Sequence, residues 1–283
     1  MTDTLALIED LRVQRPNFAL EGISFAIPRG TVVGLVGPNG AGKTTAIRAL
    51  LGLIAPDGGR VETFGLPAGS SRALARTGIV LDQPTAADEW RVSTLGRRIA
   101  PFYPSWSEQR FVDLLARLSV PQQRRVGELS RGEGIKLSLA TALAQAPELL
   151  ILDEPSSGLD PASRREIAAI IREFMVDPSH GVLVSTHITA ELEGLADELV
   201  VLVGGRVADR GPLHEVVEQF AMVRGAGAAP GAPVVGLQRS GEQWSGLIRI
   251  DDSAAFGPEV VIDAASIDDI VVHLGAERAE LAA

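Results

Sequence analysis

A glycine-rich segment that ends in lysine and threonine is the part of the sequence best suited to chemistry. Residues 37–44 read GPNGAGKT, which fits the spacing G-x-x-x-x-G-K-[ST] and lies between the apolar run TVVGLV and the helical pattern AIRALLGL. Glycines let the backbone curl around an anion, so that successive N–H groups and the helix start face phosphate oxygens. The pattern predicts a nucleotide-binding phosphate loop formed by Gly37, Pro38, Asn39, Gly40, Ala41, Gly42, Lys43, Thr44 and Thr45.

Two carboxylates further along the chain supply the remaining parts of a phosphoryl-transfer site. Within the loop, Lys43 is suited to neutralising phosphate charge, and the Thr44 hydroxyl to ligating Mg²⁺. Asp153 and Glu154 directly follow the apolar run LLIL. Asp153 is placed to hold Mg²⁺ through water, and Glu154 to polarise the attacking water as a general base. An acid pair after a strand is also common in a solvated loop or helix cap, but the phosphate loop upstream favours the catalytic interpretation.

Short apolar runs indicate the elements that must position these residues. Runs rich in Val, Ile and Leu recur with helical stretches between them, at 31–36, 78–81, 149–152, 182–185 and 199–203. Buried strands that alternate with helices are typical of an α/β fold with a largely parallel sheet. Strand-like segments at 5–13, 23–27 and 61–64 predict a small antiparallel subdomain beside that sheet.

The middle and the end of the chain break this alternation. Residues from about 84 to 145 carry helical periodicity and a Pro- and aromatic-rich segment, so we interpret them as a helical insertion. Residues 222–233 read MVRGAGAAPGAP, a composition typical of a flexible connector. The predicted organisation is therefore one ATPase-type domain over 1–220, a flexible linker over 221–233 and a small C-terminal extension over 234–283.

Composition excludes several other classes of protein. The 283 residues include no Cys, which excludes a disulfide framework, a thiolate metal site and a cysteine nucleophile. A formal net charge of −10 disfavours nucleic acid as a partner. The acidic start MTDTLALIED does not resemble an export signal, and no stretch approaches the roughly 18 apolar residues of a membrane-spanning helix.

Further motifs make the chain resemble the nucleotide-binding subunits of ABC transporters. Gln83 follows the run GIVLD, residues 129–133 read LSRGE, residues 153–161 read DEPSSGLDP, and residues 185–187 read STH. These motifs stand in the order of that family, and the resemblance covers roughly residues 5–220. It also accounts for the helical insertion, which in this family lies between the glutamine motif and the signature.

The resemblance implies roles for single residues and a dimer of two chains. Gln83 would contact Mg²⁺ and water and sense the membrane partner, and His187 would contact the γ-phosphate, so that both join Glu154 as catalytic residues. Ser130 and Gly132 would bind the γ-phosphate of an ATP held on the opposite protomer. Asp160 would lie at the dimer seam.

The sequence also departs from the family pattern at two places. The usual signature is LSGGQ, but Arg131 and Glu133 replace a Gly and the Gln. Ser130 and Glu133 also have the spacing of a capping box, which would satisfy the start of the next helix without any ligand. The family usually stacks adenine on an aromatic residue before the phosphate loop, and here Arg15, or less readily Phe18, could take that place.

The function that these patterns favour is ATP hydrolysis coupled to transport. The resemblance implies a subunit that binds ATP and Mg²⁺, pairs as a homodimer or a heterodimer with another ABC ATPase, and drives a separate transmembrane subunit, in an exporter of the drug-resistance or ABC-2 kind. It would lie at the cytoplasmic face of the membrane through protein contacts. The alternatives are a soluble ABC ATPase that acts on ribosomes or DNA, and a weakly hydrolysing regulatory subunit.

Overall fold

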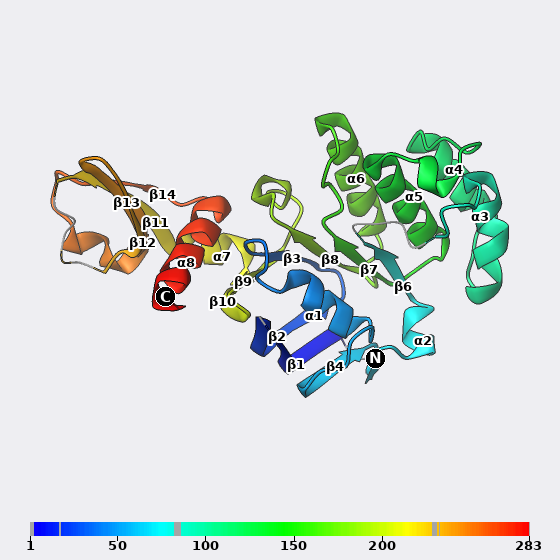
Figure 1. Ribbon diagram of the computed structural model, residues 1–283, viewed down its shortest axis with the longest axis horizontal. Helices are drawn as coiled ribbons and strands as arrows, with labels where there is room; N and C mark the ends of the chain where they lie inside the picture. Colours follow the sequence, from blue (N-terminus) through cyan, green and yellow to red (C-terminus); the bar gives the residue numbers. More distant parts are fainter. Residues whose placement is uncertain (1–2, 17, 82–85, 228–230, 232, 283) are drawn as a thin grey trace.

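A six-stranded sheet forms the centre of the molecule (Figure 1). The computed structural model describes residues 3–16, 18–81, 86–227, 231 and 233–282, with side chains described as far as residue 277. The order of the central sheet is β10-β9-β3-β8-β7-β6, and all its strand pairs are parallel except β9 with β10. The strands are β3 (Val32–Val36), β6 (Thr77–Val80), β7 (Leu149–Asp153), β8 (Gly181–Thr186), β9 (Glu198–Val203) and β10 (Arg206–Pro212).

Both faces of this sheet are covered, which explains the uninterrupted apolar runs in the sequence. Every residue of β3, β7 and β8 is buried. Alternate residues of β3 belong to two different hydrophobic clusters: Val32 and Val36 to one, Val33 and Leu35 to the other. A parallel sheet of this kind needs cover on both sides because its crossover helices pack there. The predicted α/β fold with a mainly parallel sheet is confirmed.

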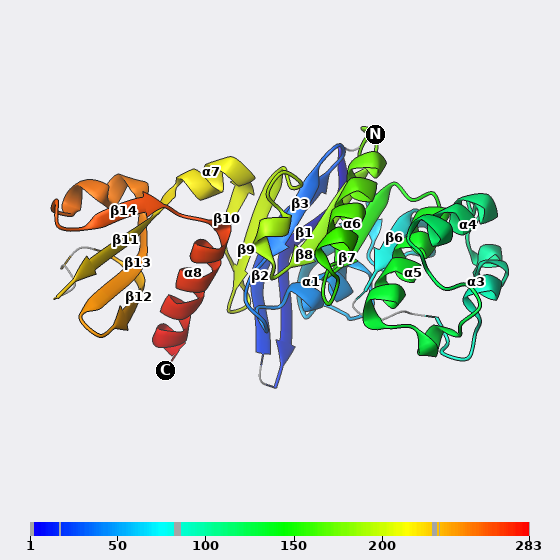
Figure 2. The same cartoon turned by 90° about the horizontal axis from the view of Figure 1, so that it is seen from above.

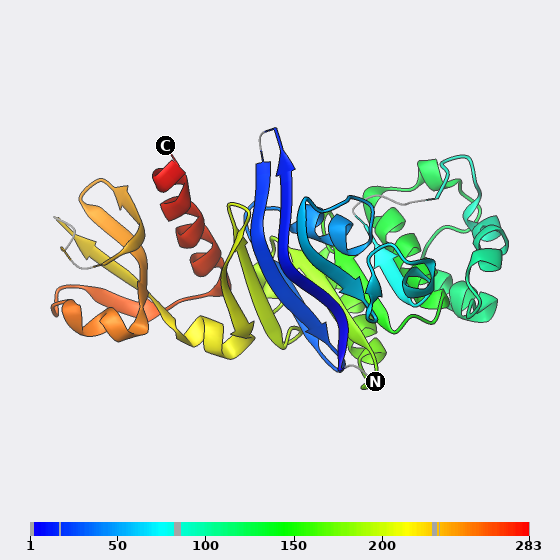
Figure 3. The ribbon, with the colours of Figure 1, turned by 90° about the horizontal axis from the view of Figure 1, so that it is seen from below.

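A second, antiparallel sheet covers one of these faces. Its order is β2-β1-β4-β5, and α1 (Lys43–Leu50) packs between it and the central sheet (Figure 3). The apolar residues of α1 share a cluster with those of β1 and β7. The antiparallel N-terminal subdomain predicted from the sequence is thus present, with strands β1 (Thr4–Arg15), β2 (Phe18–Pro28), β4 (Gly58–Thr63) and β5 (Leu66–Pro67), and the short helix α2 (Ser71–Leu74) follows it.

Helices gather at one end of the molecule, in the region predicted as an insertion (Figure 1). They are α3 (Val92–Ile99), α4 (Glu108–Arg117) and α5 (Arg131–Ala144), with 3₁₀ turns η1 (Ala100–Phe102) and η2 (Val126–Glu128). The side chain of Ser107 caps α4 by accepting a hydrogen bond from the backbone N–H of Arg110 (3.2 Å). Helix α6 (Pro161–Phe174) follows β7, and the turn η3 (Thr189–Glu191) follows β8.

The last part of the chain forms a third sheet at the opposite end of the molecule (Figure 2). Its strands are antiparallel in the order β12-β13-β11-β14, and α8 lies between this sheet and the central one. We call residues 220–282 the C-terminal unit. Its elements are β11 (Phe220–Ala226), β12 (Val235–Ser240), β13 (Gln243–Arg249), η4 (Ile250–Ala255), β14 (Val261–Ala264) and α8 (Ile267–Ala282), and α7 (Leu213–Glu218) leads into it.

The prediction of a flexible linker over 221–233 is wrong for its first six residues. They belong to β11, which pairs with both β13 and β14. One of the small residues that suggested flexibility serves packing instead: a Cβ atom at Gly225 would lie 2.5 Å from the ring of Trp244. Composition alone cannot distinguish a glycine that lets a chain bend from one that lets a large ring lie flat on a strand.

Candidate nucleotide site

Two glycines let the predicted phosphate loop run close against its neighbours. Gly37 has a φ of 156°, and a Cβ atom there would lie 2.0 Å from the carbonyl oxygen of Leu202. Gly42, with a φ of 108°, directly precedes α1, and a Cβ atom there would lie 2.4 Å from the side chain of Leu20. Glycine fits both positions because it has no side chain to clash and adopts positive φ without strain.

Lys43 connects this loop to the acidic segment after β7. It is the first residue of α1 and is only 6% exposed. Its Nζ donates a hydrogen bond to the carbonyl oxygen of Gly37 (2.7 Å) and lies 3.6 Å from Oε1 of Glu154. A buried ammonium group needs such partners, because leaving its charge unpaired would be costly. The side chain therefore bridges the two motifs that the sequence singles out.

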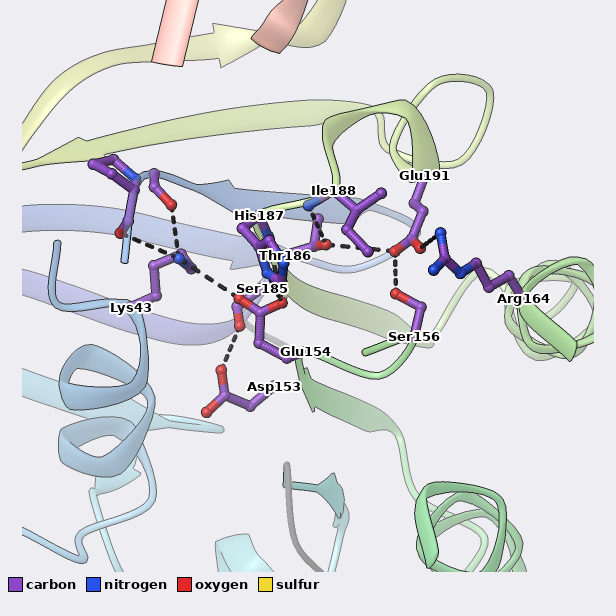
Figure 4. A network of polar contacts seen from close by, with 12 residues as sticks. Lys43, Asp153, Glu154, Ser156, Arg164, Ser185, Thr186, His187, Ile188 and Glu191 are labelled. Atoms are coloured by element: carbon purple, nitrogen blue, oxygen red, sulfur yellow. Dashed lines mark hydrogen bonds and ion pairs between the residues drawn. The ribbon is translucent and has the colours of Figure 1, made fainter. Parts of the chain in front are cut away.

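Glu154 lies between Lys43 and His187 (Figure 4). Its Oε2 is 2.6 Å from Nδ1 of His187, and its backbone N–H donates to the carbonyl oxygen of Ser185 (3.0 Å). The φ of Glu154 is 53°, which is uncommon for a residue with a side chain and is often found at functional sites. Cation, carboxylate and imidazole thus meet where three strands of the central sheet end.

Asp153 lies beside this group, at the end of β7. It is 3% exposed, and its Oδ1 accepts a hydrogen bond from the Ser185 hydroxyl. This contact orients the carboxylate at the edge of the sheet that also carries the phosphate loop (Figure 4). Thr44 is half-buried in the first turn of α1.

The residues expected to act on a second chain lie elsewhere, at the starts of two helices. Ser130 caps α5 and Asp160 caps α6. A Cβ atom at Gly132 would lie 2.7 Å from the side chain of Leu159, so the two segments are packed against each other. In the described part of the chain, Ser130 and Asp160 make no hydrogen bond to Lys43, Glu154 or His187. Gln83 lies outside the described residues.

Hydrogen bonds strongly stabilise the ionised form of Asp160. Its carboxylate accepts bonds from the Ser163 hydroxyl (2.6 Å) and from the backbone N–H groups of Ser163 (3.0 Å) and Ala162 (2.9 Å). These bonds lower the pKa of Asp160 to about 2. The residue therefore carries a negative charge throughout the physiological pH range.

The capping box suggested by Ser130 and Glu133 is formed. The Ser130 Oγ accepts from the backbone N–H of Glu133 (3.3 Å), and a carboxylate oxygen of Glu133 accepts from the backbone N–H of Ser130 (2.8 Å). That second bond is the main reason why the pKa of Glu133 lies below its ordinary value. The guanidinium of Arg124 adds to the effect from 3.6 Å. The negative charge of Glu133 is thus engaged within the chain.

Two observations add to what the sequence indicates. Phe18, rather than Arg15, lies against the phosphate loop, since a Cβ atom at Gly42 would be 2.7 Å from its ring. Arg15 instead donates to the carbonyl oxygen of Gln14 and lies 3.6 Å from Asp57. Glu191, four residues after His187, joins the polar network of the site (Figure 4). No local signal in the sequence marks it, because a neighbouring glutamate at 193 has the same residue type and a similar setting.

Comparisons with known proteins identify the family. Residues 20–157 match the model of a family described as ABC transporter. The Nod factor export ATP-binding protein I of Rhizobium sp. (strain N33) is 39% identical over 215 residues, which cover 71% of this chain and 68% of that protein. The protein of the same name from Neorhizobium galegae is 37% identical, over 74% of this chain and 62% of that one.

Solved structures give the same result. The structure of an ATP binding subunit of an ABC transporter has a TM-score of 0.69 and 29% identity, over 76% of this chain and 93% of that one. The cbiO1 protein of Clostridium perfringens, part of the ABC transporter complex cbiONQ, has a TM-score of 0.61 and 27% identity, over 76% and 91%. None of the helices in the described part of the chain has the length and apolar character of a membrane span. The chain therefore belongs to the ABC transporter ATP-binding family, whose members bind and hydrolyse ATP to power transport.

Proposed function

We propose that this chain is the ATP-hydrolysing subunit of an exporter whose membrane-spanning part is a separate polypeptide. The observation that carries the proposal is the convergence of Lys43, Glu154 and His187 at one edge of the central sheet. The names of two relatives describe export, and one structural neighbour, cbiO1, is part of a transporter complex. A peripheral position at the cytoplasmic face of the membrane follows from such a partnership.

The contacts of Lys43 and Glu154 support a mechanism for hydrolysis. ATP entering the loop draws the Lys43 ammonium from Glu154 toward the β- and γ-phosphates, because phosphate oxygens carry more negative charge. Glu154 is then free to accept a proton from the attacking water. The water oxygen bonds to the γ-phosphorus and the bond to the bridging oxygen breaks, which yields ADP and phosphate. His187 holds the Glu154 carboxylate through Nδ1 and contacts the γ-phosphate with its remaining ring edge.

The donor set around Asp153 suits Mg²⁺. A buried carboxylate and the Thr44 hydroxyl are oxygen ligands of the kind that this cation takes beside nucleotide phosphates and water. When bound, Mg²⁺ neutralises charge that develops on the phosphates. Asp153 would hold the ion through water and Thr44 would contact it directly, while Gln83 is proposed as a further contact on the basis of the family resemblance alone.

We further propose that two chains enclose each ATP, with Ser130, Gly132 and Asp160 acting on the nucleotide site of the partner. Ser130 lies at the N-terminus of α5, where its Oγ accepts from the backbone N–H of Glu133, and its role toward a γ-phosphate oxygen is proposed from the family resemblance. The start of α5 adds the positive end of a helix dipole. Either a second copy of this chain or another ABC ATPase could supply the opposing site.

An apolar groove between the helical insertion and the rest of the ATPase domain is the proposed docking place for the membrane partner. The groove has a volume of about 370 Å³, and its lining includes Leu81, Ala86, Trp90 and Tyr103. Gln83, which lies outside the described residues, falls between Leu81 and Ala86 in the sequence. We assign the groove to a short amphipathic helix from a cytoplasmic loop of the transmembrane subunit, because such helices bind apolar grooves through their apolar face.

The variant Glu154→Gln tests both parts of the proposal. We expect it to bind ATP, to hydrolyse it at least about a hundredfold more slowly than the wild-type chain, and to elute as a dimer in gel filtration with ATP. Affinity purification of this variant from detergent-solubilised cells should retain a polytopic membrane protein. Lys43→Ala is the control, because it should neither bind nucleotide nor dimerise. Normal hydrolysis by Glu154→Gln would remove Glu154 as the base, and capture of ribosomal or DNA-bound proteins alone would contradict the transport function.

A further inference from the structure

The carboxylate of Glu191 contacts three different segments around the nucleotide site (Figure 4). Glu191 lies at the end of η3, and its side chain is 18% exposed. Its Oε2 accepts a hydrogen bond from the Ser156 hydroxyl and a longer one from the Thr186 hydroxyl (3.4 Å). Its Oε1 lies 3.7 Å from Nη1 of Arg164. One mostly buried carboxylate therefore contacts two hydroxyl groups and one guanidinium group.

Two of these partners are close in sequence to a residue of the proposed site. Ser156 comes two residues after Glu154, and Thr186 directly precedes His187. The Thr186 Oγ1 also accepts from the backbone N–H of Ile188 (2.9 Å), which shapes the turn that carries His187. Because both hydroxyls donate to the same oxygen of Glu191, the loop after β7 and the loop after β8 are held at a set distance from each other.

Arg164 extends the network to the segment before α6. Its Nε donates to the carbonyl oxygen of Leu159 (3.0 Å), next to Asp160. Within the described residues, Oε1 of Glu191 has no hydrogen-bond partner, so the ion pair with Arg164 is its main compensation. Burying a carboxylate in this way is costly, and an apolar residue would fill the same space at lower cost. The arrangement therefore favours a role in positioning over one in stability.

We propose that Glu191 is a positioning residue for ATP hydrolysis, which keeps the Glu154–His187 pair aligned and couples it to the segment 157–160. This inference rests on the proposed function, because Glu154 and His187 must act on the phosphate and segment 157–160 must face the partner chain. Glu191 itself touches neither nucleotide nor water in this scheme. Its effect is to hold the two loops at the separation at which the Glu154 carboxylate and the His187 imidazole are in contact.

The test compares Glu191→Ala, Glu191→Gln and Glu193→Ala in the full-length chain. We expect Glu191→Ala to lower kcat about tenfold to a hundredfold, while the Kd for a fluorescent ATP analogue and the KM for ATP stay within about threefold of wild type. Glu191→Gln keeps an acceptor oxygen for Ser156 and should recover part of the lost rate. Glu193→Ala is the matched control, because Glu193 is an exposed glutamate two residues away and should leave kcat unchanged.

Two outcomes would overturn the inference. One is a wild-type kcat in Glu191→Ala, and the other is a loss of ATP affinity equal to the loss of kcat. If Glu191→Ala does not fold, Ser156→Ala tests the same link from the other side and should lower kcat by a similar mechanism. The fold-loss of kcat in the double variant Ser156→Ala/Glu191→Gln should then be smaller than the product of the fold-losses in the two single variants. Glu154→Gln separates the two proposals. If Glu154→Gln hydrolyses ATP at the wild-type rate, the proposed function fails. If Glu154→Gln is inactive but the Glu191 variants hydrolyse ATP at the wild-type rate, only the inference about Glu191 fails.

Discussion

Glu133 shows how a charged residue in the signature can be accommodated. Its carboxylate closes the capping box with Ser130 and pairs with Arg124, so little of its charge is left to oppose a triphosphate. We expect Glu133→Gln to change the ATPase rate by less than about twofold. The glutamine keeps an acceptor for the N–H of Ser130 and loses only a partly exposed ion pair, of a kind that contributes about 0.2–1 kcal/mol to stability.

The measurement is steady-state ATPase activity together with the thermal unfolding midpoint. A several-fold rise in rate would contradict the expectation and show that the Glu133 charge opposes nucleotide binding. Arg131→Gly, made in parallel, separates the effect of the second departure from the family signature. Glu133→Ala removes the cap as well and should therefore lower the unfolding midpoint more than Glu133→Gln does.

The sequence could indicate which residues lie close together where a motif directly follows a strand. Lys43 and Glu154 could be placed together because the carboxyl ends of parallel strands meet at one edge of a sheet. Glu191 could not be found in this way, since its role depends on contacts with Ser156 and Arg164, which come from other elements. Arg15 and Phe18 are register partners in the β1–β2 pair, so the sequence alone could not tell which of the two side chains lies against the phosphate loop.

At the scale of elements, α6 depends on Asp160 for its start. The carboxylate accepts bonds from two backbone N–H groups at the beginning of the helix. Because hydrogen bonds lower its pKa from 3.8 to about 2, the ionised form stabilises the folded state. The contribution is fully present above the ordinary value of 3.8 and is lost as the pH falls through about 2.

We therefore expect Asp160→Ala to lower the free energy of unfolding at pH 7 and equally at pH 5. The difference from wild type should shrink only below about pH 4, as the aspartate of the wild-type chain takes up its proton. Urea unfolding at several pH values checks this, with Asp160→Asn as the control that keeps a capping oxygen without the charge. A difference that already disappears between pH 7 and pH 5 would show that another titrating group is responsible.

The prediction of elements succeeded for buried strands and failed for one composition-based segment. Runs such as 149–152 are apolar throughout because both faces of the central sheet are covered, and periodicity recognises this pattern well. The segment 221–226 has the composition of a linker because it is rich in small residues. Its Gly225 is required by the ring of Trp244 on the neighbouring strand, a pairing that cannot be seen before the strands are paired.

At the scale of the whole molecule, the C-terminal unit lies close to the nucleotide site. Helix α8 packs against β9 and η3, the turn that ends in Glu191. A Cβ atom at Gly275 of α8 would lie 3.7 Å from Pro38 of the phosphate loop, an ordinary contact distance. The helical insertion, with the proposed docking groove, lies at the other end of the molecule (Figure 2). The helical insertion and the C-terminal unit thus lie at opposite ends of the molecule.

Gly275→Ala should stabilise the chain. The residue lies in the interior of α8, where replacing glycine by alanine favours the helix by about 0.5–1 kcal/mol, and the added methyl group meets no backbone atom within 3.7 Å. Thermal unfolding of the variant checks this. Gly42→Ala is the contrasting control and should destabilise, because its Cβ atom would overlap Leu20 at a backbone φ of 108°. A lower midpoint for Gly275→Ala would mean that α8 and the phosphate loop are packed more tightly than their distance indicates.

Truncation tests whether the C-terminal unit is part of the main core. Apolar residues of β13 and α8, including Leu247 and Ile270, belong to the same hydrophobic cluster as Leu199 and Val201 of β9. A chain ending at residue 233 loses these side chains, each of which contributes about 1.5–3 kcal/mol when fully buried. It also leaves β11 without both of its partner strands, as an apolar edge prone to aggregation.

We expect the chain ending at residue 233 to unfold more than about 10 °C below the full-length chain and to aggregate on concentration. A chain ending at residue 219 lacks the unpaired strand β11 and should aggregate less, although it also loses the cover over β9. Light scattering and thermal unfolding distinguish the two. If the chain ending at 233 instead unfolds at the full-length midpoint and binds ATP normally, the C-terminal unit is a separate domain, and the cluster it shares with β9 contributes little to stability. The difference in aggregation between the two truncated chains thus measures the effect of an unpaired β11. The loss of thermal stability that both truncated chains show relative to the full-length chain measures how much of the core the C-terminal unit supplies.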